Sequence, residues 1–398
     1  MTFPVKWFSS DFRGAPTING QAGSLIGALE ACLITGFGEI TATSVTVSGG
    51  IATATHNSGD WFADHAVIAV SGATPAELNG ESRVLSHTAT TTTWATTAVD
   101  GAATGVIKIR YAPVGGWEVA FSKTNVRVLR STDLQAHGHY LRVDDSATTY
   151  ARVRGYETMS DVDTGTSPFP TDAQMSGGGY WHKSSAANAT ANTWWLAADS
   201  RSLLPAIAAG SGASATNNAA APYFWGDLVP LAPGGDAYAS ALQCNWTSTS
   251  SQDGSFVYTA ASTATSGALF LPRVYNGSGS SVMVRAQPYL GVTGGNIVSG
   301  GASTFGAAPG TADGAVILSS LFVIDTAGAG QSPRADVPGV YFIPQSGALS
   351  MFVGGAIESG GASLGNRELL MLYCGFGSGR GVTAGGVYAV DITGPWHG

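Results

Sequence analysis

Charged residues are scarce in this sequence. Only 11% of its 398 residues are Asp, Glu, Lys or Arg, whereas an average globular protein has about a quarter. The net charge is −8, and no segment concentrates lysine or arginine. Nucleic-acid binders need a basic surface that faces the phosphates, so the composition argues against binding to DNA or RNA.

Cysteine and long apolar runs are also few. The three cysteines, Cys32, Cys244 and Cys374, lie far apart and without CxxC spacing. This pattern argues against a disulfide framework and a structural zinc site, and we expect buried free thiols. No stretch approaches the length of a membrane span, and the first residues lack the pattern of a secretory signal. We therefore expect assembly in a cytosol and no membrane insertion.

Glycine and aromatic residues are what the chain has in quantity. It contains 55 Gly, 10 Trp, 13 Tyr and 15 Phe. A chain this poor in charge and rich in small residues would tend to disorder without aromatics, but aromatic rings bury large areas. We predict a folded protein with long loops at 211–221, 247–253 and 294–313, which would carry function or wrap a neighbour.

Helical periodicity occurs near the N-terminus. Apolar residues from Leu25 to Leu33 recur at the spacing of one helix face, with Ser24 as the expected N-cap and Gly36 as the expected stop. Elsewhere, short alternating or apolar runs are separated by turn residues, which is typical of strands. The sequence predicts a mostly β fold of β-sandwich- or barrel-like modules with one short N-terminal helix.

The pattern divides the chain into three parts. We predict an N-terminal docking segment with the helix at 1–38, a small β-sandwich or barrel module at 39–113, and a larger β-rich domain at 114–398. Within the module, Ser44–Thr55 reads as a hairpin in which Gly49 and Gly50 supply the positive φ angles of a two-residue turn. We expect removal of residues 1–38 to leave a folded protein.

Four aromatic residues are candidates for ligand binding: Tyr180, Trp181, Trp194 and Trp195. Aromatic faces can stack on sugar rings, and Tyr180 and Trp181 follow a run of three glycines. Neighbouring residues on a strand point to opposite faces, so Trp194 and Trp195 cannot share one platform. Core packing or a subunit interface is the favoured alternative for these rings.

Signals for a metal or a catalytic site are weak. His137 and His139 would share a face of a strand, but no third and fourth ligand is recognisable. Glycine-rich segments at Gly277 and Gly375 do not open a helix, as a nucleophile elbow or phosphate loop would. Asp133, Asp199 and Asp227 belong to a set of scattered carboxylates whose spatial pairing the sequence does not reveal. We predict no metal, no cofactor, no catalytic residue and no enzyme activity.

Three stretches carry a family resemblance: VKWFSSDFRGAPTINGQAGSLIGALEACLITGFG, YFWGDLVPLAPGGDAYA and VYAVDITGPW. The chain resembles an uncharacterised family of structural proteins from tailed bacteriophages and prophages. The resemblance implies a virion component of the tail or its tip, made and assembled in the host bacterial cytoplasm. It carries no catalytic motif.

The expected partners are further copies of the chain and other virion proteins. A charge-poor β protein with long loops suits a symmetric multimer, with the N-terminal segment and the closing ITGPWHG as docking segments. Two alternatives stay open: a lectin-like module that binds a host surface glycan, and a capsid decoration protein. A polysaccharide depolymerase ranks last, because neither a carboxylate pair nor a solenoid repeat is evident.

Overall fold

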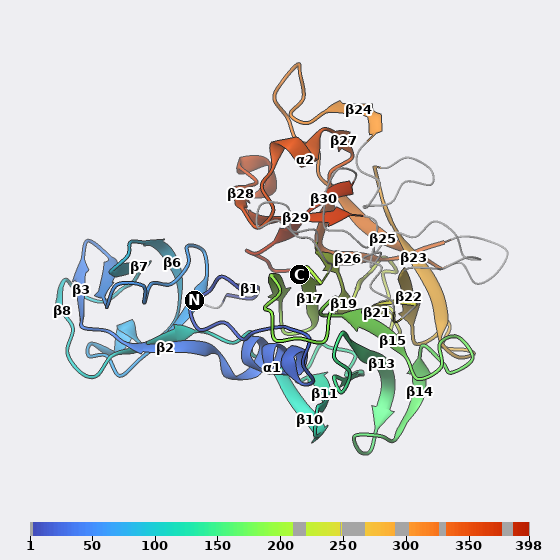
Figure 1. The fold of residues 1–398 in the computed structure, drawn as a ribbon. Helices are drawn as coiled ribbons and strands as arrows, with labels where there is room; N and C mark the ends of the chain where they lie inside the picture. The colour runs from blue at the N-terminus through green and yellow to red at the C-terminus, as the bar shows by residue number, and fades with distance from the viewer. Residues whose placement is uncertain are drawn as a thin grey trace.

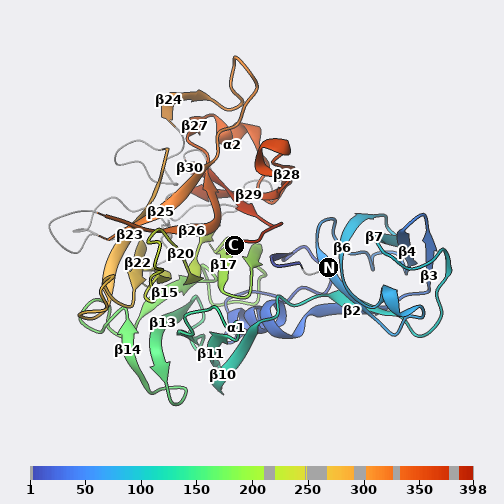
Figure 2. The ribbon, with the colours of Figure 1, turned by 180° about the vertical axis from the view of Figure 1, so that it is seen from behind.

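The computed structural model describes residues 3–209, 220–246, 248, 267–290, 302–325, 332–375 and 385–397. The loops predicted at 211–221 and 247–253 lie largely outside these residues, as does most of the glycine-rich segment at Gly375. Of the loop predicted at 294–313, residues 302–313 are described, and the prediction is wrong over Ala302–Ala307, which forms a strand because its backbone pairs with a later segment of the chain. The fold is mostly β, with few and short helices, as predicted. Both ribbon views place a small β-structure beside a larger body, with the N-terminus between them (Figures 1 and 2).

The small β-structure is a closed antiparallel barrel. Its strands are β2 (Phe37–Thr41), β3 (Ser44–Ser48), β4 (Ile51–Thr55), β5 (Val67–Ser71), β6 (Gly80–His87), β7 (Thr91–Ala95), β8 (Gly101–Ala102) and β9 (Lys108–Tyr111). β2 continues into β3, and this run pairs with β9 and β8 on one side and β4 on the other. β7, β6 and β5 complete the ring between β4 and β9. The continuous run of β2 and β3 thus closes the ring.

The predicted hairpin at Ser44–Thr55 is confirmed. β3 and β4 pair antiparallel, and the turn between them holds Gly49 at φ 57° and Gly50 at φ 78°. Alternate residues of β3 face the interior, where Trp94 is fully buried. Two local signals, the alternation of apolar and polar residues and the two glycines of the turn, are therefore sufficient to predict this hairpin.

Over the residues that the structure describes, the larger body is built on one sheet of twenty strands. Its N-terminal half contains β1 (Lys6–Ser9), β10 (Trp117–Lys123), β11 (Val126–Ser131), β12 (Tyr140–Asp144), β13 (Tyr150–Met159), β14 (Gly165–Phe169), β15 (Gly179–His182), β16 (Trp194–Ala198), β17 (Ser202–Ile207) and β18 (Ala221–Pro222). The rest are β19 (Phe224–Asp227), β20 (Val229–Pro230), β21 (Ser240–Asn245), β22 (Gly267–Leu271), β23 (Val282–Pro288), β25 (Ser319–Asp325), β26 (Ser332–Phe342), β28 (Ile357–Ser359), β29 (Glu368–Gly375) and β30 (Gly385–Asp391).

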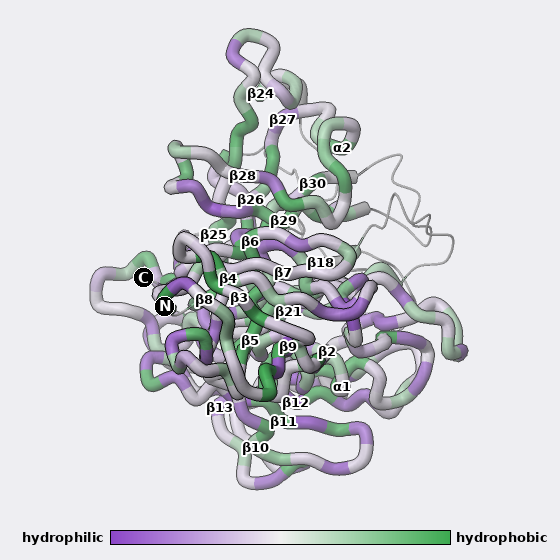
Figure 3. Tube along the Cα trace, turned by 90° about the vertical axis from the view of Figure 1, so that its left-hand side faces the viewer, coloured by the Kyte–Doolittle hydropathy of each residue, from purple (hydrophilic) through white to green (hydrophobic). Residues whose placement is uncertain are grey.

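Smaller elements decorate this body. β24 (Ala302–Ala307) and β27 (Gln345–Ser346) form a separate parallel pair, beside the short helix α2 (Ala348–Met351). Hydrophobic and hydrophilic stretches interleave through both parts of the molecule (Figure 3), as expected for strands with a buried and an exposed face. No helix within the described ranges is long and apolar enough to cross a membrane.

The predicted helix exists, but its start differs from the prediction. α1 spans Ser24–Glu30 and continues as a π-helical turn over Ala31–Thr35, ending at Gly36 as predicted. Gly23, at φ 83°, takes the N-cap position in place of Ser24. The first helical amides bond instead to the side chain of Asp145, which is 120 residues away in sequence. A distant carboxylate has therefore replaced the local cap.

The segment 1–38 packs within its own chain. β1 pairs with β16 of the body, and Phe8 is 1% exposed. Phe12 stacks on Tyr111 of the barrel, with ring centroids 4.6 Å apart. Lys6 donates hydrogen bonds to Glu81 of the barrel and to the carbonyl of Pro113. The segment thus contacts both the barrel and the body of its own chain.

Candidate functional site

Three of the four predicted ligand-binding residues are buried. Trp181, Trp194 and Trp195 are 0%, 1% and 4% exposed. The indole N–H of Trp181 donates to the carbonyl of Gln243 at 2.7 Å, and that of Trp194 donates to the carbonyl of Pro16 at 3.0 Å. β16 is covered on both faces, so both members of the tryptophan pair pack in the core. These rings therefore offer no open face to a sugar in this structure.

Tyr180 is the partly exposed member of the predicted set. Its hydroxyl accepts a hydrogen bond from Arg152, whose guanidinium carbon lies 4.0 Å from the ring centroid. Tyr150 contacts the same ring edge-on, at 5.0 Å between centroids. A cation and a second aromatic ring of the same chain thus already occupy the surfaces that a stacking ligand would use.

The structure does not assemble a metal centre around His137 and His139. Their rings are 6.0 Å apart, and His139 meets the edge of Phe169 at 5.7 Å. His137 turns toward Ser240 and Asp227. Among the described residues, no group of three or more His, Cys, Asp or Glu side chains is placed to hold a metal ion.

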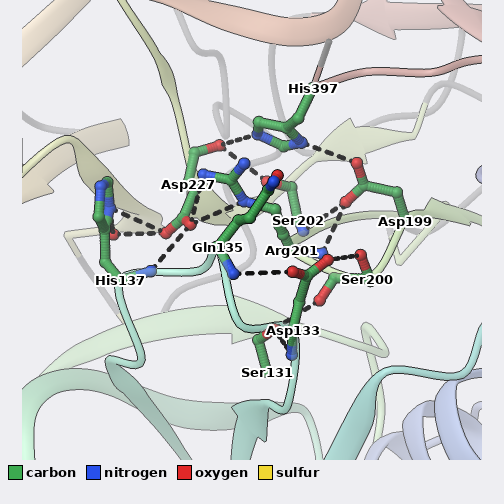
Figure 4. Close-up of polar contacts among 11 residues, drawn as sticks. Ser131, Asp133, Gln135, His137, Asp199, Ser200, Arg201, Ser202, Asp227 and His397 are labelled. Carbon is green, nitrogen blue, oxygen red and sulfur yellow. Dashed lines mark hydrogen bonds and ion pairs between the residues drawn. The ribbon is translucent and has the colours of Figure 1, made fainter. Parts of the chain in front are cut away.

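His137 instead belongs to a polar cluster around Asp227, at the end of β19 (Figure 4). The Asp227 carboxylate is 4% exposed. It accepts hydrogen bonds from the backbone amide of His137 at 3.1 Å, from Arg201 at 3.1 Å and from the Ser240 hydroxyl at 2.8 Å. Burial opposes ionisation, but the contacts with His137, Ser240 and Arg201 outweigh it and lower the pKa of Asp227 to about 2.

Asp199 forms the other half of this cluster. One carboxylate oxygen accepts the amides of Arg201 at 2.8 Å and Ser202 at 2.7 Å, which shapes the turn between β16 and β17. The other lies 2.8 Å from Nδ1 of His397, whose Nε2 is 3.1 Å from the carbonyl oxygen of Asp227. The predicted C-terminal docking segment is thus bound to its own chain at His397 (Figure 4).

The cluster lacks the arrangement of a serine hydrolase. In a catalytic triad, serine and carboxylate bond to opposite nitrogens of the imidazole. Here Ser240 and Asp227 both lie on the Nδ1 side of His137, at 2.9 Å and 3.1 Å. The Ser240 hydroxyl is also placed to donate to the carboxylate, so its proton is not directed at a base. This geometry holds a turn in place and does not activate a nucleophile.

A cavity of about 370 Å³ lies beside the cluster. Its charged and polar walls come from the N-terminal strand, the barrel, the β11–β12 loop, the β16–β17 turn and the C-terminal segment: Lys6, Glu81, Asp133, Gln135, Asp199, Ser200, Arg201 and His397. A hydrogen bond from Ser200 is the main cause that lowers the pKa of Asp133, and the amide of Gln135 adds to it. Carboxylates, cations and an amide together suit a hydroxyl-rich, uncharged ligand better than an ion.

Three carboxylates of the cluster and the cavity were already candidates in the sequence, but the sequence does not reveal that they lie close together. Asp133, Asp199 and Asp227 come from three separate strand ends, and His397 is 198 residues from Asp199. The one local signal is the segment Asp199-Ser200-Arg201-Ser202. An aspartate side chain can accept the backbone amides of the residues that follow it, which is typical of a turn. Arg201 and His397 have no distinguishing pattern in the sequence.

Neither the scan against family models nor the search of curated proteins finds a match to this chain.

The environment of His139 predicts how stability depends on pH. Burial, aided by the charge of His137, lowers the pKa of His139 to about 4, while an unfolded histidine titrates near 6.5. Between these values the unfolded chain binds more protons, so stability falls as pH drops from about 6.5 to about 4. In the His139→Phe variant, the free energy of unfolding that is lost between pH 7 and pH 4 should be smaller by up to about 3 kcal/mol. Urea unfolding at pH 7 and pH 4 measures it, and an equal fall in variant and parent would contradict the prediction.

Proposed function

We propose that this chain is a structural component of a tailed-bacteriophage virion, placed at the tail tip, baseplate or a fibre. It assembles there as a symmetric multimer with itself and other virion proteins, and has no enzymatic role. The proposal starts from the resemblance of the opening, middle and closing stretches of the sequence to virion structural proteins. The geometry adds support through the barrel.

The supporting observation is a closed barrel held beside the body with apolar residues uncovered at one end. Ile51 is 36% exposed and Val99 is 78% exposed. They flank the β3–β4 turn, where Asp100 accepts the amide of Gly49 and Gly50 accepts the amide of Thr96. β3 and β8, next to this turn, lie far from the body in Figure 1. Such a surface suits contact with another protein of the particle.

Immunogold electron microscopy of particles from a host lysate tests the proposal. Label at the tail end is the expected result, because the resemblance is to tail-region proteins. Label around the head would replace the tail assignment with the capsid decoration alternative. Absence of label from every particle, with an antibody that recognises the native protein, would overturn the virion proposal and leave the glycan-binding alternative.

The glycan-binding alternative is supported by the cavity beside Asp199, since the tryptophans first considered for it are buried. Asp133, Gln135 and Arg201 supply both acceptors and donors for sugar hydroxyls. Gln135 is exposed, so Gln135→Ala leaves the core intact. In a glycan-binding protein that variant would lose sugar affinity without losing stability, whereas a purely structural subunit has no affinity to lose.

A further inference from the structure

A buried lysine and a buried aspartate meet away from the polar cluster. Lys183 follows β15, and Asp145 follows β12 in the turn toward β13. The side chains of both residues are 0% exposed, and Nζ of Lys183 contacts Oδ1 of Asp145. The amine also donates to the carbonyl of Gln21 at 2.6 Å. The amine and the carboxyl are therefore held against each other by their surroundings.

The second carboxyl oxygen of Asp145 has its own donors. Oδ2 accepts the backbone amides of Leu25 at 2.8 Å and Ile26 at 3.2 Å. Two amides on one oxygen are the arrangement that stabilises negative charge on an acyl group under attack by a nucleophile. Oδ1, which faces the amine, is left as the oxygen that would depart.

The protein interior favours the uncharged forms of the pair. Burial is the largest influence on both groups: it raises the pKa of Asp145 and lowers the pKa of Lys183, against the opposing attraction between them. An uncharged amine is a nucleophile, and a protonated carboxyl can release one oxygen as water. Transfer of one proton from amine to carboxyl within the contact produces both forms.

We propose that Asp145 and Lys183 join in an intramolecular isopeptide bond. Nζ of Lys183 attacks Cγ of Asp145 while the amides of Leu25 and Ile26 hold the charge on Oδ2. The Cγ–Oδ1 bond breaks, and Oδ1 leaves as water with the carboxyl proton and one proton from the amine. The product is a neutral amide, and the step uses no oxidant or other reactant. It links two points 38 residues apart.

Lys6 provides a matched comparison within the same chain. It is also buried and contacts a carboxylate, that of Glu81, but the Glu81 side chain is 37% exposed. Solvent therefore reaches that carboxylate, whereas the carboxyl of Asp145 is enclosed. The same reaction is therefore not expected at Lys6, although the contact between amine and carboxylate is similar.

The mass of the full chain, measured after denaturation, tests the bond without relying on the proposed function. The expected mass is one water below that of the sequence, and proteolysis should release a branched peptide that contains both Asp145 and Lys183. Lys183→Met and Asp145→Ala should each have their full sequence mass. Lys6→Met should still be one water lighter than its sequence.

Two results would overturn the proposal. The first is a wild-type chain of full mass whose Lys183 amine reacts with an acylating reagent after unfolding. The second is a mass deficit that persists in Lys183→Met or Asp145→Ala, because the lost water would then come from elsewhere. The denatured mass reports on the bond even if a variant folds poorly.

Discussion

Deletion of residues 1–38 is expected to leave no soluble folded protein. The segment supplies β1, which pairs with β16, and the helix α1, whose inner face is buried at Leu25 and Leu29. Removing one buried leucine or phenylalanine side chain costs about 2–5 kcal/mol, and the segment contains several. Their sum exceeds the roughly 5–15 kcal/mol by which a typical domain is stable.

The deletion would also expose polar groups that the segment covers. Without Gln21 and the amides of Leu25 and Ile26, Asp145 and Lys183 would lose partners that hold them in the interior. The measurement is the soluble yield and far-UV circular dichroism of a 39–398 chain. Gly27→Ala is the matched control, because a Cβ at Gly27 meets nothing within 4 Å and the parent fold should persist. A folded, soluble 39–398 chain would instead favour the detachable docking segment predicted from the sequence.

Local chemistry explains which elements the sequence could predict. The β3–β4 hairpin depends on alternation over a few residues and on two glycines that accept positive φ, and all of this is contained in the hairpin itself. The end of the helical segment at Gly36 is similarly local. The prediction of Ser24 as the N-cap was wrong. The hydroxyl of Ser24 donates to the carbonyl of Asn19, and the distant Asp145 accepts the helix amides instead.

The candidate site shows the same limit more strongly. Strand alternation predicts that Trp194 and Trp195 point to opposite faces, but it does not reveal whether each face is covered. In this fold the neighbouring elements bury both rings. Asp227 and His137 likewise meet across 90 residues, so a histidine that could be weighed as a metal ligand is placed among hydrogen-bond partners. The topology of the large sheet, which local patterns do not encode, brings these groups together.

The Trp181→Ala substitution is expected to lower the free energy of unfolding by about 3–5 kcal/mol, as large aromatic truncations in a core do. Trp181 is fully buried and stacks on Tyr223 at 5.5 Å between centroids. Its removal would also leave the Gln243 carbonyl without the indole donor. Denaturant unfolding followed by fluorescence measures the change.

Tyr180→Ala is the control for Trp181→Ala, since it lies at the adjacent position of β15 but is only partly buried. Its loss should cost about 1–2 kcal/mol, because one cation–π contact and one hydrogen bond disappear. A fall of similar size in both variants would contradict the assignment of Trp181 to the core. Unchanged stability in Trp181→Ala together with lost sugar affinity would instead support the ligand-binding role predicted for Trp181. A ring that contributes nothing to the stability of the core is available to bind a ligand.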